Sequence, residues 1–95
     1  MFDERFNIVK ESLGEYFKEI LEMYKDELIL VKDNLEKDLC NKKIVHSLKS
    51  SSGSLGSIEV FTECDKYING ENHILIDVIQ DCIKLIETDT LLNIG

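Results

Sequence analysis

Apolar residues recur every three or four positions along most of this chain, which is the spacing of one face of an α-helix. The pattern predicts a short first helix with Asp3 as its N-terminal cap, followed by a long helix of about 24 residues that begins near Leu13. A lone glycine, Gly14, falls between them and costs only about 1 kcal/mol inside a helix, so the two segments can be separate or continuous. The apolar stripe of these segments consists of Phe2, Phe6, Val9, Leu13, Tyr16, Phe17, Ile20, Leu21, Tyr24, Leu28, Val31 and Leu35.

Three more helices are predicted beyond this stripe. The first starts at about Leu39, where Asp38 can cap its free amides. The second is closed by Asn69-Gly70, a helix-stop and turn pair, and residues 90–95 after the third are apolar enough to dock. The stripes of the second and third are Ile58, Phe61, Cys64, Tyr67 and Ile68, and Ile74, Leu75, Val78, Ile79, Cys82, Ile83 and Ile86.

The run of serines at residues 50–54 opposes helix formation. Four serines at about 0.5 kcal/mol each and one glycine at about 1 kcal/mol make it roughly 3 kcal/mol worse than alanine as helix. Leu48, Ser52 and Leu55 nevertheless keep the helical spacing, and burying two leucines offsets a deficit of that size. We expect the helix to continue through about Ser52 and to break near Gly56.

Length and composition favour one small helical domain. The chain has 95 residues, 43% of them hydrophobic, with five glycines and no proline, which is enough for a single modest core and few turns. We expect residues 1–95 to form one all-α domain, an up-down antiparallel four-helix bundle with a short additional N-terminal helix. Met23, Ile29 and Leu30 lie off the main stripe, which permits dimerisation without requiring it, so the oligomeric state stays open.

The charge points to protein partners. A formal charge of −8 repels phosphate backbones and anionic lipid, so we expect no nucleic acid and no membrane as partner. The start Met-Phe-Asp-Glu-Arg lacks the features of a signal peptide, and no apolar run is long enough to span a bilayer, so the expected location is the cytoplasm.

Cys40, Cys64 and Cys82 are widely spaced; the last two fall on apolar stripes, which indicates reduced core thiols and neither a metal site nor a redox site.

One histidine, His46, has neighbours that indicate chemistry. In a helix it is flanked one or two turns away on the same face by cationic and small residues, whereas Val45, Leu48, Ser52 and Leu55 form the opposite face. The helix can therefore pack inward while the imidazole points outward. The flanking residues are Lys42, Lys43, Lys49, Ser50 and Gly53.

The segment around His46 resembles the signature of histidine phosphotransfer (HPt) domains, a His-x-Leu-Lys-Gly run followed within two helical turns by Leu-Gly. The matching stretch is His46-Ser47-Leu48-Lys49-Ser50-Ser51-Ser52-Gly53-Ser54-Leu55-Gly56. The resemblance implies that His46 accepts a phosphoryl group from a receiver-domain aspartyl-phosphate and passes it to another receiver. Ser50 departs from the family, which has glycine there; its hydroxyl can donate to a phosphoryl oxygen or bond back to the helix carbonyl.

The resemblance also implies roles for the neighbours. Lys49 is the cation near the phosphoryl oxygens, and Leu55 and Gly56 are structural. From their place on the same helix face as His46, we expect Lys42, Lys43 and Gly53 to be binding positions. Partners are receiver domains of response regulators or hybrid histidine kinases. The chain is then a stoichiometric carrier and no enzyme, without ATP site, cofactor or metal, because in such relays the metal and the aspartate belong to the receiver.

Three alternatives compete with this interpretation. A sensor-kinase dimerisation hairpin has an acidic residue after its histidine and soon a proline, where this chain has Ser47 and no proline. A phosphate-binding loop at Gly53-Ser-Leu-Gly56-Ser lacks the required lysine. The third is a helical adaptor that docks receivers or other signalling proteins without carrying phosphate, because Ser50 obstructs the site. His73, beside the Asn-Gly turn, is expected to have no role.

Overall fold

The computed structural model describes residues 2–39 and 42–88, and within them the chain is helical. The N-terminal helix α1 (Glu4–Leu13) leads through one 3-10 turn, η1 (Gly14–Tyr16), into the longest helix, α2 (Phe17–Glu36). Three helices follow, α3 (Lys42–Leu55), α4 (Ile58–Ile68) and α5 (Leu75–Glu87). The described residues contain no strand, only an isolated bridge between Phe2 and Ser57. Cys40 and the segment 90–95 lie outside the described residues, so the expectations for them have no counterpart here.

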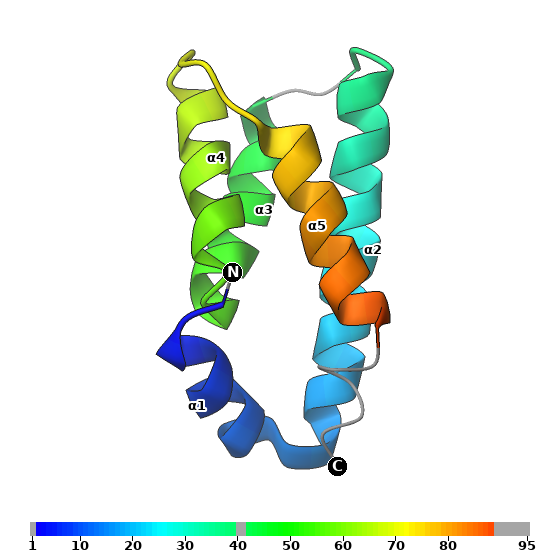
Figure 1. The fold of residues 1–95 in the computed structure, drawn as a ribbon, viewed down its shortest axis with the longest axis vertical. Coiled ribbons are helices and arrows are strands. Elements are labelled where there is room, and N and C mark those ends of the chain that lie inside the picture. Colours follow the sequence, from blue (N-terminus) through cyan, green and yellow to red (C-terminus); the bar gives the residue numbers. More distant parts are fainter. Residues whose placement is uncertain (1, 40–41, 89–95) are drawn as a thin grey trace.

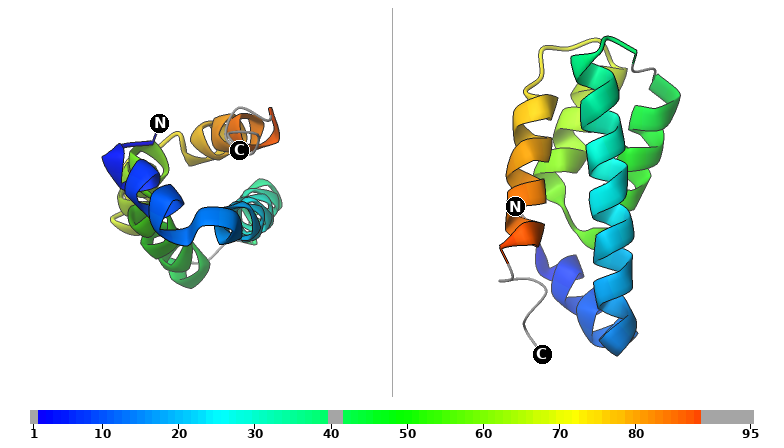
Figure 2. Two further views of the ribbon diagram at one scale, coloured as in Figure 1. Left: turned by 90° about the horizontal axis from the view of Figure 1, so that it is seen from below. Right: turned by 90° about the vertical axis from the view of Figure 1, so that its right-hand side faces the viewer.

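Four helices, α2 to α5, pack together around one core (Figure 1). The closest pairs are α3 with α4 and α2 with α5, and contacts between α4 and α5 and between α2 and α3 join these pairs. Helix α1 lies across one end of the group and contacts α2 and α3, as the view from below shows (Figure 2). The fully buried side chains of this core come from all four helices; they are Leu21, Leu28, Leu48, Leu75, Ile79, Ile86, Val31, Val45, Val60, Cys64, Cys82 and Ser52.

The first two helices are separate. The Asp3 carboxylate accepts a hydrogen bond from the Arg5 amide at 3.0 Å, which confirms the predicted cap. Gly14 ends α1 with φ 56°, a left-handed conformation that favours glycine, and the chain then turns into α2. The long helix therefore begins at Phe17 and has 20 residues, fewer than predicted from Leu13.

The described part of helix α3 begins at Lys42, directly after residues 40–41, which lie outside the described residues, so its predicted start near Leu39 with Asp38 as cap stays a prediction. Asp38 itself has φ 57° in the turn after α2. Helix α3 continues through the serines to Leu55, past the predicted end at Ser52. Ser52 is buried, and its hydroxyl bonds the Tyr24 hydroxyl at 2.7 Å, so this serine stabilises the contact with α2.

The predicted apolar stripe of α4 was partly wrong. Cys64 is buried as expected, but Ile58 and Phe61 are 47% and 39% exposed, and the inward positions are Val60 and Cys64. The predicted stop at Asn69-Gly70 is confirmed, with α4 ending at Ile68 and Gly70 at φ 75°.

A buried carboxylate joins α4 to the start of α5. Glu63 accepts a hydrogen bond from the Ile74 amide at 2.8 Å and pairs with Lys66 at 3.0 Å. The bond from Ile74, followed by the contact with Lys66, holds the pKa of this carboxyl below its usual value. Its negative charge lies at the N-terminal end of α5, where the helix dipole favours it.

None of the helices in the described residues combines the length and apolar character that crossing a membrane requires. Cys64 and Cys82 are buried thiols that form no disulfide, as predicted, and burial raises the pKa of the Cys82 thiol to about 11.

Candidate functional site

The imidazole of His46 is exposed on the outer side of α3. Val45 and Leu48, one and two residues away, are fully buried. Helix α3 therefore packs against the core on the side of these two residues while His46 faces solvent, as the spacing predicted. Ser50, one turn further along, is also exposed. A partner therefore has access to the ring from solvent.

The three lysines near His46 have different surroundings. Lys42 and Lys43, in the first turn of α3, are exposed. Lys49 has a side chain that is only 24% exposed, and its ammonium contacts the Asp65 carboxylate of α4 at 2.7 Å. The sequence placed these lysines on one face but gave no indication that an acidic residue of another helix binds one of them.

Gly53 makes room for an aromatic ring of the next helix. A Cβ at this position would lie 3.2 and 3.3 Å from two ring atoms of Phe61, closer than ordinary van der Waals contact. The same ring lies 5.2 Å from the Lys49 ammonium, within the range of a cation–π interaction. Gly53 thus contributes to the site by letting Phe61 lie against α3 beside Lys49.

Leu55 and Gly56 shape the end of α3. Leu55 is buried in the core, and Gly56 ends α3 with φ 77°. The Gly56 carbonyl accepts a hydrogen bond from the Asp3 amide at 2.8 Å, and a Cβ on Gly56 would collide with the Asp3 carboxylate. The Arg5 guanidinium also donates to the Gly53 carbonyl at 3.2 Å, so the start of α1 is attached to the end of α3.

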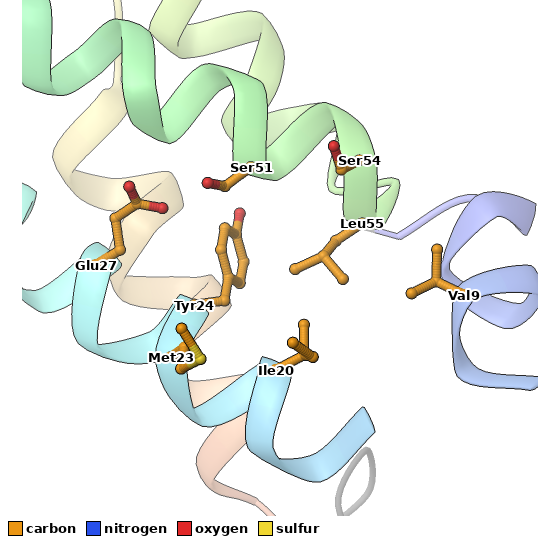
Figure 3. Close-up of a pocket in the computed structure, with 8 residues that line it drawn as sticks. All are labelled: Val9, Ile20, Met23, Tyr24, Glu27, Ser51, Ser54 and Leu55. Atoms are coloured by element: carbon orange, nitrogen blue, oxygen red, sulfur yellow. The ribbon is translucent and has the colours of Figure 1, made fainter. Parts of the chain in front are cut away.

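A groove of about 520 Å³ lies between α1, α2 and α3 (Figure 3). Figure 3 shows Tyr24 and Glu27 of α2 opposite Ser51 of α3, with Val9 of α1 at the other end. Met23, at its rim, is 66% exposed. The Ser47 hydroxyl, next to His46 in sequence, donates to the Glu27 carboxylate at 3.1 Å. The groove thus offers an apolar surface with one acidic side chain, Glu27, which contacts the residue after His46 in the sequence.

The second histidine, His73, has local contacts. Its Nδ1 accepts a hydrogen bond from the Leu75 amide at 3.2 Å, and its ring packs edge-on against Tyr67, with the ring centroids 5.2 Å apart. These contacts belong to the α4–α5 turn, and the expectation that His73 has no chemical role stays a prediction. Within the described ranges, 2–39 and 42–88, no group of three His, Cys, Asp or Glu side chains could hold a metal ion.

No family model, curated protein or solved structure matches the chain.

Proposed function

We propose that this chain is a phosphorelay intermediate that accepts a phosphoryl group on His46 from a receiver-domain aspartyl-phosphate and passes it to another receiver. The observation that carries the proposal is the exposed imidazole of His46, mounted on a helix whose other face is fully buried. The resemblance of residues 46–56 to the HPt signature gives that imidazole its chemistry.

The transfer requires little of this chain beyond position and charge. A neutral ring nitrogen attacks phosphorus, the P–N bond forms as the P–O bond to the aspartate breaks, the carboxylate leaves, and the imidazole loses its proton to water. Such displacement depends on in-line positioning and neutralisation of the phosphoryl charge. Lys42, Lys43 and Lys49 supply cations, the Ser50 hydroxyl is a possible donor, and the receiver supplies the aspartate and its metal.

The groove between α1, α2 and α3 supports the expectation that the partner is a protein. A receiver that brings its phosphorylated aspartate to His46 covers the neighbouring surface of α3, and the apolar groove with exposed Met23 offers area to bury there. The formal charge of −8 argues against nucleic acid and anionic membranes as partners.

We infer one HPt-like domain over residues 1–95, folded as an up-down antiparallel bundle of α2 to α5 with α1 as the additional N-terminal helix. The turns after α2 and α4 lie at the same end of the molecule, which supports this topology (Figure 1). The protein acts in the cytoplasm as a stoichiometric carrier without turnover, ATP site or cofactor of its own.

Incubation with a phosphorylated receiver tests the proposal. We expect an acid-labile, base-stable phosphoryl group on the wild-type chain, lost completely in His46→Gln and retained in the matched control His73→Gln. Label retained in His46→Gln would refute the assignment. A stable complex with the receiver but no label on the wild-type chain would instead identify the protein as a helical adaptor.

A further inference from the structure

The cation one turn from His46 is held by another helix. The Lys49 ammonium contacts the Asp65 carboxylate at 2.7 Å and lies 5.2 Å from the centroid of the Phe61 ring. Asp65 is itself contacted by the Asn69 amide at 3.4 Å, at the end of α4. Phe61 reaches α3 because Gly53 has no side chain. Helix α4 therefore determines where the ammonium group of Lys49 lies.

We propose that Asp65 is a positioning residue that competes with a phosphoryl group on His46 for the ammonium group of Lys49. The proposal rests on the proposed function of His46 and adds a regulator of that site, located on a different helix. In the unphosphorylated protein, the carboxylate and the Phe61 ring keep Lys49 beside α4. A phosphoryl group must draw Lys49 away from Asp65, so the ion pair limits how strongly the site retains phosphate.

The charges of Lys49 and Asp65 determine how strongly the pair attracts a phosphoryl anion at His46. The Lys49–Asp65 pair is nearly neutral as a unit, so it attracts an anion less than a free lysine does. Both partners are partly exposed, with side chains 24% and 46% accessible, so solvent weakens the pair without removing it. Loss of the Asp65 charge should therefore favour an approaching or bound phosphoryl anion at His46, and a carrier that must release phosphate benefits from keeping that charge.

Phosphoramidate tests the competition without a receiver. His46 displaces ammonia from this reagent: the P–N bond of phosphoramidate breaks, a P–N bond to the imidazole forms, and the imidazole proton leaves with the ammonia. All variants carry His73→Gln, which leaves His46 as the sole histidine. We expect Asp65→Asn to speed the appearance of phosphohistidine, measured by phosphorus NMR, about three- to tenfold.

Three further variants test whether the faster phosphorylation of Asp65→Asn depends on the lost charge and on Lys49. Asp65→Glu, which restores the carboxylate, should return the rate toward that of the parent. Asp81→Asn removes the same charge from the exposed side of α5 and should leave the rate within about twofold, since screening weakens distant charges. In a Lys49→Gln background, Asp65→Asn should produce a smaller acceleration. Circular dichroism and thermal unfolding check that each variant keeps its fold.

The outcomes separate this inference from the proposed function. An unchanged rate in Asp65→Asn, or an equal acceleration with and without Lys49, would overturn the role of Asp65. Because the reagent is a small molecule, neither result depends on whether a receiver phosphorylates the protein. Failure of every receiver to label His46 would count against the relay while leaving the measured competition for Lys49 in place.

Discussion

Ser50 lies one helical turn beyond His46 on the same side of α3, so its side chain is the one to vary in a test of access to the imidazole. Ser50 is exposed there, where the family that the chain resembles has glycine. We expect Ser50→Leu to slow phosphoryl transfer from a receiver at least about tenfold, because a branched side chain covers the in-line path and small misplacements are costly. Ser50→Gly should transfer at the wild-type rate or faster, with a loss in stability of about 0.5 kcal/mol. Stopped-flow transfer measurements check both rates, and normal transfer by Ser50→Leu would mean that the receiver approaches from another direction.

Single residues also show what the sequence could and could not predict about the site. The helical period fixes the angle of each side chain around its own axis, so the outward position of His46 and the inward position of Leu48 could be predicted. It does not say which helix lies alongside. The contact of Lys49 with Asp65 depends on the packing of α4 against α3, and no local pattern encodes it. The same packing explains the wrong prediction for Phe61, which lies over Gly53 and not in the core.

At the scale of elements, the attachment of α1 depends on Gly56. Its φ of 77° is strained for any side chain, and a Cβ would collide with the Asp3 carboxylate and approach the Phe6 amide within 2.9 Å. We expect Gly56→Ala to lower the free energy of unfolding by about 2–4 kcal/mol, measured by urea denaturation, and to release the start of α1. Gly70→Ala is the matched control: its φ of 75° is similar but nothing lies near its Cβ, so only about 1–2 kcal/mol is expected. Equal losses in the two variants would show that the contact with Asp3 contributes nothing.

The elements themselves were largely predictable, and their ends were not. Apolar spacing gave five helical segments, and the glycines at positions 14, 56 and 70 mark breaks where the backbone is left-handed. Propensity alone would have made residues 50–54 a loop. Tertiary contacts reverse that preference, since Ser52 bonds the buried Tyr24 hydroxyl and Leu55 enters the core. The long helix begins at Phe17 and not at Leu13, because Gly14 adopts a left-handed conformation that ends α1, and α3 continues past Ser52 to Leu55.

For the whole molecule, acidic charge is distributed so that few regions attract an anion. The chain has 19 acidic and 11 basic residues, and several lysines are paired with carboxylates: Lys25 with Glu22, Lys32 with Glu36, Lys37 with Asp33, Lys49 with Asp65, and Lys66 with Glu63. Lys42 and Lys43 are exposed at the start of the helix that carries His46. Two exposed lysines therefore lie in the first turn of the helix that carries the proposed phosphoryl acceptor.

One carboxylate, Glu63, is expected to contribute to the response of the whole fold to acid. The folded-state pKa of Glu63 is lowered, chiefly by the hydrogen bond from the Ile74 amide, so its contribution to stability is present above the unfolded value of 4.5 and is lost as the pH falls through the folded value. Falling pH also relieves repulsion among the many acidic residues, which acts in the opposite direction.

We expect Glu63→Gln to lower the free energy of unfolding at pH 7 by about 1–2 kcal/mol and to flatten its decline below pH 4.5, because glutamine cannot titrate. Urea denaturation between pH 7 and pH 3 measures both, with Glu71→Gln in the exposed α4–α5 turn as the control. If wild type and Glu63→Gln lost stability in parallel below pH 4.5, other carboxylates would have to account for the acid response, and the link between α4 and α5 would be independent of the charge on Glu63.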